Sequence, residues 1–188
     1  MNFCSACGHA ITCRIPEGDN RMRCVCDACG TVHYENPKVL VSVMANLGDR
    51  LLWVRRAEAP RAGYWFVPAG FMEQGESLQE AAAREFMEET GILLPASAMH
   101  LYAVGSLVDI NEVYVAFRTT LNDTHQLNPG AEVSEAGLFS EAQLPWDELA
   151  FPDVIEQVRC FYRELHQGQF GIHLGEYRHD SQHVVRVD

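Results

Sequence analysis

The pattern of apolar and polar residues divides the chain into a short N-terminal segment and a longer remainder. Residues 1–34 contain few aliphatic side chains but many cysteines and glycines, and the first long apolar run begins at Val39. The run from Val39 to Leu47 is typical of a buried strand, and the run from Leu51 to Arg56 predicts a second one. A Gly-Asp turn separates the two, so we expect them to pair as a hairpin.

Two helices follow from the pattern and its end signals. Ser77 and Glu80 match a capping box, and Gly91 provides the left-handed residue that helix C-termini favour, so the first helix is predicted between them. The second is predicted within residues 145–168, with a break at Pro152. Shorter apolar runs predict further strands at 100–108, 112–121 and 136–140. Strands and helices in this mixed order favour an α/β or α+β sandwich, with helices packed on a mixed sheet.

Composition and charge narrow the class of protein. Apolar residues make up 47% of the chain and charged residues 21%, which is ordinary for a globular protein. The chain has no run of about 18 apolar residues, so no membrane span is predicted. Residues 1–10 lack the basic stretch followed by an apolar stretch that marks a signal peptide, so a cytoplasmic location is expected. The net charge of −12 argues against nucleic-acid binding, which relies on Lys and Arg. An anionic substrate would need a metal ion to offset this charge.

The N-terminal cysteines have the spacing of a metal site. Cys4 and Cys7 form one CxxC pair, Cys26 and Cys29 form another, and 18 residues separate the pairs. This is the ligand spacing of a four-thiolate zinc ribbon. A segment with so few apolar residues needs a metal ion to fold. The prediction is therefore a structural Zn²⁺ site, with free cysteines in a loop as the alternative.

Other residues are weaker zinc candidates. Cys13 and Cys24 do not belong to CxxC pairs of their own. His33 lies close to the second pair, but the four better-spaced thiolates leave it no place. Cys160 lies on the predicted late helix and is interpreted as a core thiol.

Three glutamates crowd one face of the first predicted helix. Glu85 lies three residues before Glu88 and four before Glu89, so their side chains share a face. Like charges at these spacings destabilise an isolated helix by about 0.2–0.5 kcal/mol per pair. A solvated acidic face is one interpretation, and a site for a hard divalent cation is the other.

The residues around this helix resemble the Nudix box, the signature of the Nudix hydrolases. From Gly70 the chain reads GFMEQGESLQEAAAREFMEETGI, and every fixed position of the box is present over 23 residues. Such a match is a very specific signal. The resemblance implies a Nudix-type α/β/α sandwich with a mixed sheet, preceded by the small zinc ribbon. The implied division is a ribbon at 1–36, a Nudix hydrolase domain at 37–168 and a C-terminal tail at 169–188.

The resemblance also implies the catalytic residues and their metal. The implied ligands of Mg²⁺ or Mn²⁺ are Glu85, Glu88, Glu89, the carbonyl oxygen of Gly70 and Glu132. Glu135 is the alternative for the last position. In this family the arginine of the box orients the glutamates by ion pairing, and here that residue is Arg84. Glu88 is predicted to activate the attacking water. The bound cation would turn an acidic surface into one that binds a diphosphate.

The branch of the family suggests a substrate class. A ribbon joined to a Nudix domain by HYENPKV resembles the NADH-pyrophosphatase-like group and its zinc-ribbon relatives. The NADH-specific branch carries an SQPWPFPxS-type motif, and residues 105–117 read GSLVDINEVYVAF instead. Other stretches resemble relatives described as ADP-ribose or FAD pyrophosphatases. The resemblance thus implies hydrolysis of a diphosphate that joins a nucleoside to another moiety, with ADP-ribose or FAD preferred and NADH or NAD-capped RNA as alternatives.

Substrate contacts and partners complete the expectations. Aromatic rings can stack on a base, although rings in strands are more often core residues. Arginines can bind phosphates. The candidates are Trp65, Phe66, Tyr114, Arg55, Arg56 and Arg61. The expected partner is a small nucleotide, and a homodimer is an alternative to a monomer. A non-catalytic nucleotide- or nucleic-acid-binding module is the rival function, against which the complete glutamate set argues.

Overall fold

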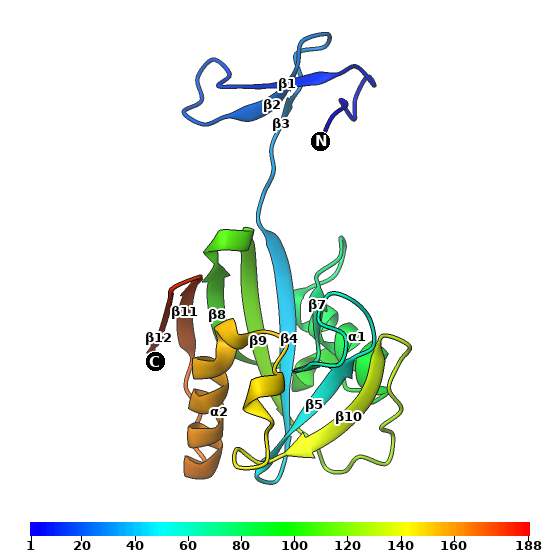
Figure 1. Cartoon of the computed structure of the whole chain (residues 1–188), viewed down its shortest axis with the longest axis vertical. Helices are drawn as coiled ribbons and strands as arrows, with labels where there is room; N and C mark the ends of the chain where they lie inside the picture. Colours follow the sequence, from blue (N-terminus) through cyan, green and yellow to red (C-terminus); the bar gives the residue numbers. More distant parts are fainter. The chain divides into compact units, whose positions relative to one another are not determined.

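The computed structural model describes residues 1–188, except the side chain of Asp153. It contains two compact units, Met1–Pro37 and Lys38–Asp188. The first is a three-stranded sheet, and the second is a nine-stranded sheet with helices α1 and α2 (Figure 1). None of the helices in the described chain is long and apolar enough to cross a membrane.

The first unit has almost no apolar core. Strand β2 (Arg23–Cys26) lies between β1 (Ile11–Arg14) and β3 (Val32–His33), and both pairings are antiparallel. The buried residues of its described part are Cys4, Val25 and Cys26. So small a core cannot offset the entropy of ordering the chain, and the unit therefore needs a cross-link or a metal to fold.

The second unit is built on a mixed sheet. Its strand order is β10-β5-β4-β9-β8-β11-β12, with β6 paired to β5 and β7 to β4. The β4–β9 and β8–β11 pairs are parallel, and the other pairs are antiparallel. The bounds are β4 Lys38–Leu47, β5 Arg50–Arg56, β6 Trp65–Phe66, β7 Ala69–Phe71, β8 His100–Leu107, β9 Glu112–Thr120, β10 Val133–Phe139, β11 His173–Arg178 and β12 Ser181–Arg186.

Helix α1 (Leu78–Thr90) begins and ends as its sequence predicts. The Ser77 hydroxyl accepts a hydrogen bond from the Glu80 amide at 3.3 Å, and the Glu80 carboxylate accepts from the Ser77 amide at 2.8 Å. Gly91 is left-handed, with φ of 75°. The capping box and the C-terminal glycine are thus confirmed.

The late segment differs from the single broken helix of the prediction. It contains three helical pieces, because prolines interrupt the backbone hydrogen bonding of the run. The bounds are η3 Trp146–Glu148, η4 Pro152–Val154 and α2 Ile155–Gln167, and the other 3₁₀ turns are η1 Ala96–Ala98 and η2 Val108–Ile110.

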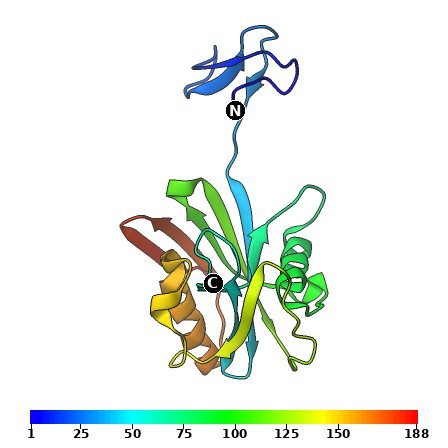
Figure 2. The ribbon, with the colours of Figure 1, turned by 45° about the vertical axis from the view of Figure 1, so that its right-hand side comes forward.

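Alternation along β4 explains the three layers. Val41, Val43 and Ala45 pack in the cluster that contains Ala82 and Phe86 of α1, whereas Met44 packs in the cluster of Phe161 and Tyr162 of α2. Successive strand residues point to opposite faces, so one buried strand serves both helices. Figure 2 shows α1 and α2 on opposite sides of the sheet. The predicted α/β/α sandwich with a mixed sheet is confirmed.

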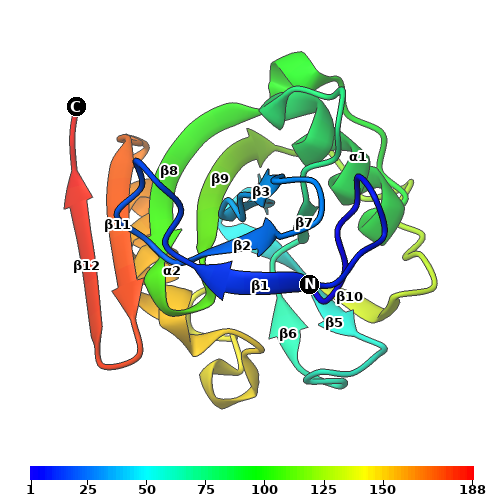
Figure 3. The same ribbon diagram turned by 90° about the horizontal axis from the view of Figure 1, so that it is seen from above.

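The C-terminal residues form two strands that sequence analysis did not predict. Strands β11 and β12 extend the sheet beyond β8 (Figure 3). Along β11 the buried residues are His173, Gly175 and Tyr177, and the alternate residues are exposed. The alternation of a half-buried strand is therefore present, but its inward side chains are not aliphatic, which hid it in the sequence.

Candidate active site and metal centres

A cavity of about 940 Å³ lies in the second unit. Its walls come from β4 to β9, η2, α1, α2 and the residues before β10 and α2. One set of lining residues is acidic: Glu73, Glu85, Glu88, Glu89, Glu112 and Glu132. Another is apolar or aromatic: Trp53, Trp65, Phe66, Val67, Leu149, Phe151 and Val158. A large apolar cavity with a few converging charged groups is the usual form of a small-molecule site.

The three glutamates of α1 all line this cavity, in three different environments. Glu89 is buried, and its carboxylate accepts a hydrogen bond from the Ala69 amide at 2.9 Å. Glu85 is partly buried, whereas half of the Glu88 side chain is exposed. Strand β7 and the helix thus hold one carboxylate firmly and leave another free to meet solvent or substrate.

Burial and mutual repulsion disfavour the charged forms of these groups. Burial raises the pKa of Glu89 to about 8, and the neighbouring charges of Glu85 and Glu132 act in the same direction. Burial also raises the pKa of Glu85, with further contributions from Glu88 and Glu132. The positive charge near these carboxylates is therefore too small to neutralise them. A bound divalent cation would reduce their mutual repulsion and favour their ionised forms.

Arg84 is the positive charge within this acidic group. Its guanidinium donates to Glu76 at 2.7 and 3.0 Å, to Glu85 at 2.7 Å and to Glu88 at 3.2 Å. These carboxylates raise the pKa of Arg84, so it is always charged. Glu76 was absent from the predicted site residues. Its place in the Nudix box is the signal that could have identified it as the anchor of Arg84.

Gly70 allows the backbone of β7 to approach Glu85. A Cβ atom at this position would overlap the carboxyl group of Glu85. Glu132 lies on the cavity wall, and its charge acts on both Glu85 and Glu89. Its rival Glu135 instead pairs with Arg55 at 3.2 Å and is not part of the lining. The structure therefore brings Gly70 and Glu132, but not Glu135, to the glutamates.

The two candidate phosphate-binding arginines of β5 are placed differently. Arg56 lines the cavity, with its guanidinium over the Phe66 ring at 5.3 Å. Arg55 is bound by Glu135 and Glu148 and lies outside the residues that line the cavity, as does Arg61. Alternation along β5 separates Arg55 from Arg56, because adjacent strand residues point to opposite faces.

The predicted aromatic contacts are both core residues and cavity walls. Trp65, Phe66 and Tyr114 are each buried, and all three line the cavity. The Tyr114 hydroxyl accepts hydrogen bonds from Ser42 at 2.7 Å and Gln157 at 3.4 Å, which anchors the ring in place. These side chains therefore form a rigid wall.

The far wall was missed by sequence analysis. Leu149, Phe151, Val154 and Val158 come from the segment around η4 and α2, more than fifty residues after the glutamates. Phe151 remains partly exposed, and its ring contacts Phe66 edge-on at 6.5 Å between centroids. An apolar helix face carries no signal that it borders a ligand cavity instead of the core.

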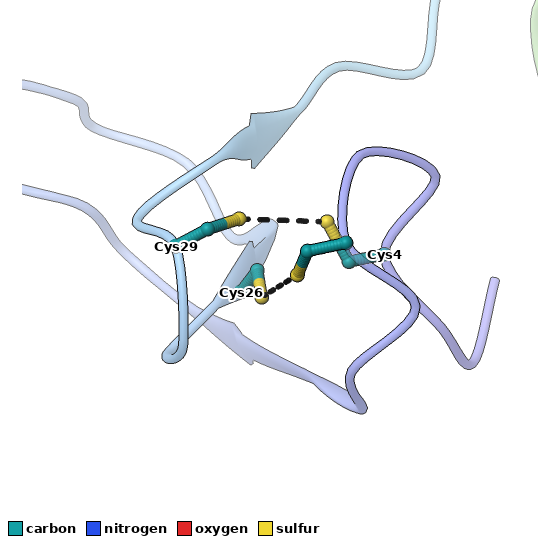
Figure 4. A group of neighbouring side chains, drawn as sticks. Cys4, Cys26 and Cys29 are labelled. Atoms are coloured by element: carbon teal, nitrogen blue, oxygen red, sulfur yellow. Dashed lines mark hydrogen bonds between the residues drawn. The ribbon is translucent and has the colours of Figure 1, made fainter.

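The four cysteines of the first unit converge, as Figure 4 shows for the labelled Cys4, Cys26 and Cys29. The Sγ atoms of Cys4 and Cys29 are 3.7 Å apart, those of Cys7 and Cys26 are 3.4 Å apart, and all four lie within 4.8 Å of one another. Hydrogen bonds from the Thr31 hydroxyl and amide lower the pKa of Cys29 to about 6. Four converging thiol groups are the donor set of a tetrahedral zinc site.

The weaker zinc candidates lie beside this set. Cys13 and Cys24 face each other across β1 and β2, with 3.6 Å between their sulfurs. They do not belong to the four-sulfur cluster. The His33 ring nitrogen Nε2 lies 3.3 Å from the Cys4 sulfur, as a hydrogen-bond partner to the cluster.

Comparison with protein families and curated relatives identifies the family of the chain. The NUDIX domain family matches residues 36–165, and the Nudix N-terminal zinc-ribbon family matches residues 2–35. NAD-capped RNA hydrolase NudC of Photobacterium profundum is 30% identical over 148 residues, which are 77% of this chain and 52% of that protein. The chain thus spans about half the length of the curated relatives it matches.

Solved structures share the fold. A NUDIX hydrolase from Nitrosomonas europaea is 42% identical, with a TM-score of 0.87, over 94% of this chain and 98% of that one. An ADP-ribose pyrophosphatase from Streptococcus suis 89-1591 has a TM-score of 0.62 at 20% identity, over 74% of this chain and 99% of that one, and shows the fold alone. Family, fold and glutamate helix agree: the chain belongs to the Nudix hydrolase family and carries the family's N-terminal zinc-ribbon segment.

Proposed function

We propose that this protein is a divalent-metal-dependent hydrolase that cleaves the diphosphate joining a nucleoside to a second moiety and releases a nucleoside monophosphate. The observation that carries the proposal is the meeting of Glu85, Glu88, Glu89 and Glu132 in one cavity whose other walls are aromatic and apolar. The acidic part suits a metal-bound diphosphate, and the aromatic part suits the groups on either side of it.

The donor set fits Mg²⁺ or Mn²⁺. Both ions prefer oxygen ligands, and Mg²⁺ keeps open positions for water and substrate phosphates. The site has oxygen donors alone, raised carboxyl pKa values and a glycine where a Cβ would displace Glu85. When bound, the ion supplies charge neutralisation and a more acidic water. The Gly70 carbonyl and Glu132 are proposed to complete the ligand set.

The protein residues have distinct roles in this proposal. Glu88, the most exposed of the three, accepts the proton of the attacking water. Arg84 is a positioning residue, because its hydrogen bonds hold Glu85 and Glu88 in fixed relation to Glu76. Arg56 contacts a phosphate, since it is the candidate arginine that lines the cavity. Trp65 and Phe66 exclude water and hold the nucleoside.

The preferred substrates are ADP-ribose and FAD. Support comes from the resemblance to zinc-ribbon relatives with these activities and from GSLVDINEVYVAF in place of the NADH-type motif. NAD-capped RNA is the second candidate, because the similar NudC proteins are named for its hydrolysis. The net charge of −12 favours the small molecules, since RNA binding relies on positive charge.

A substrate panel tests the proposal. The value of kcat/KM is measured for ADP-ribose, FAD, NADH, NAD-capped RNA and a nucleoside triphosphate, with Mg²⁺ and with chelator. We expect activity in Mg²⁺ and none in chelator. The value of kcat/KM should be at least tenfold higher for ADP-ribose or FAD than for the other substrates. A tenfold preference for NADH, NAD-capped RNA or the triphosphate would overturn the substrate assignment. Undiminished turnover in chelator would overturn the metal-dependent mechanism.

We also propose that Cys4, Cys7, Cys26 and Cys29 bind one structural Zn²⁺. Support comes from their converging sulfurs and from the minimal core around them. Elemental analysis of protein purified without chelator should give one equivalent of zinc that Cys26→Ser removes. Zinc-free, folded protein would contradict this assignment.

A further inference from the structure

A second group of metal-ligating side chains lies outside the catalytic cavity, where α2 contacts the first residue of β11. Cys160 and Glu164 are four residues apart on α2, so they share a face of the helix. His173 begins β11. A sulfur, a carboxylate oxygen and a ring nitrogen from these residues lie within 4.8 Å of one another. None of the three lines the catalytic cavity.

Two of these groups are deeply buried. Glu164 is 5% exposed and His173 is 3% exposed, whereas Cys160 is partly buried. His173 Nε2 lies 3.0 and 3.1 Å from the two Glu164 oxygens. A buried carboxylate costs several kcal/mol unless it is paired or bound to a metal. The histidine meets part of this need, and the Gly171 amide donates a longer hydrogen bond of 3.4 Å to one Glu164 oxygen. The carboxylate oxygens still have lone pairs that could bind a metal ion.

Tyr102 supplies an independent observation. This β8 residue is fully buried, and its hydroxyl has no hydrogen-bond partner within the part of the chain that the structure describes. Its ring lies 4.9 Å from the His173 ring. The Glu164 carboxylate and the Cys160 thiol both lie close to this hydroxyl. A buried donor without an acceptor costs about 1–3 kcal/mol, and ionisation of the nearby thiol would offer it a stronger acceptor.

We propose that Cys160, Glu164 and His173 bind a divalent transition-metal ion of the Zn²⁺ class. A sulfur, a nitrogen and an oxygen donor suit Zn²⁺, whereas Mg²⁺ prefers oxygen ligands alone. Thiolate and carboxylate together balance the two charges of the ion. The thiol proton leaves to solvent as the metal–sulfur bond forms, and the thiolate then accepts the hydrogen bond of Tyr102. The ion would join α2 to β11.

Two arginines now occupy the surroundings of this cluster. Arg163 lies 3.0 Å from the Cys160 sulfur, and Arg186 lies 3.7 Å from a Glu164 oxygen. Both are exposed, and Arg186 is also bound to Asp188 at 2.8 Å. Each can turn toward solvent without breaking the core, so a cation can replace them beside the anionic ligands.

Zinc counting on the full chain tests the proposal, in excess Mg²⁺ so that the catalytic glutamates are not counted. Wild-type protein should retain one more equivalent of zinc than Cys160→Ser, and Cys24→Ser is the matched control that should retain the wild-type amount. Added zinc should also raise the melting temperature of Cys26→Ser but not that of Cys26→Ser combined with Cys160→Ser.

The outcomes separate this site from the ribbon and from catalysis. Loss of one equivalent in Cys160→Ser supports the site whatever the ribbon binds, because Cys160 lies in the other unit. Equal zinc content in wild type and Cys160→Ser would overturn the proposal and leave an ordinary His–Glu hydrogen bond. His173→Gln should repeat the loss, with folding checked by circular dichroism. No readout depends on hydrolase activity.

Discussion

The four cysteines and the three glutamates are proposed ligand sets of similar size in units with very different cores. Around the cysteines, the buried apolar residues of the described unit are Cys4, Val25 and Cys26, so two of the three are themselves proposed ligands. The glutamates project from α1, whose Ala82 and Phe86 pack into a core that is complete without them. In the first unit the ligands are most of the core, and in the second they are attached to one.

This difference predicts opposite responses to ligand loss. A structural metal contributes folding free energy directly where no sufficient core exists. A catalytic metal binds carboxylates that repel one another, so its ligands destabilise the fold slightly and serve the reaction. Loss of a cysteine should therefore unfold the ribbon, whereas loss of a glutamate should lower turnover and leave the fold intact.

The largest expected effect is on the ribbon. Cys26→Ser removes a fully buried ligand from β2 and should abolish zinc binding in Met1–Pro37, where a structural zinc is worth about 10–16 kcal/mol. Hydrogen exchange should then show lost amide protection in this unit alone. Cys24→Ser, on the same strand, is the control. Retained amide protection in Cys26→Ser would contradict a structural role for the cysteines.

The next effect is on catalysis. A glutamine at Glu85, Glu88 or Glu89 should lower kcat by about 10²–10⁴, because positioning and charge stabilisation carry most of phosphoryl-transfer catalysis. The fold should survive in each variant, as checked by thermal unfolding.

Glu80→Gln is the matched control for this series. Glu80 lies on the same helix but caps its first turn, so its replacement should cost less than tenfold in kcat and about 1 kcal/mol or less in stability. If Glu80→Gln harmed turnover as much as Glu89→Gln, the catalytic assignment of this helix face would fail.

A smaller effect is expected from Gly70→Ala. The added Cβ would overlap the Glu85 carboxyl group and must displace it. We expect a loss of about tenfold to a hundredfold in kcat/KM, with a higher Mg²⁺ concentration needed for half-maximal activity, since a shift of about 1 Å can cost a hundredfold. Titration of activity with Mg²⁺ checks this. An unchanged Mg²⁺ requirement would show that the approach of Gly70 to Glu85 has no part in metal binding.

The last effect concerns stability and pH in chelator. The pKa of Glu89 rises from its ordinary 4.5 to about 8 in the fold because of burial. Its protonated form is thus favoured by folding, and this stability is complete below pH 4.5 and lost as the pH rises through about 8. The free energy of unfolding should fall with a slope of up to about 1.4 kcal/mol per pH unit.

Denaturant unfolding at several pH values measures this slope. Glu89→Gln should flatten it, because the amide does not ionise, whereas Glu80→Gln should leave it in place. An identical slope in wild type and Glu89→Gln would mean that another group causes the pH dependence.

The sequence predicted elements whose signals are local. Ser77, Glu80 and Gly91 mark the ends of α1 by hydrogen bonds within a few residues, and the structure has them there. The sequence did not reveal the surroundings of Cys160, which was interpreted as a core thiol and lies beside Glu164 and His173. That grouping depends on how β11 docks, and residues in β11 showed no period.

The Nudix family, the sandwich, the cysteine set and the helical face of Glu85, Glu88 and Glu89 could all be predicted from the amino-acid sequence. Each follows from spacing along one element or from a contiguous motif, and such spacing survives any tertiary arrangement. The fold was needed to show that Arg56 and not Arg55 lines the cavity, that Glu132 and not Glu135 joins the glutamates, and that the segment around Phe151 closes the far wall. These choices depend on strand pairing and packing between segments far apart in the chain, which no local pattern specifies.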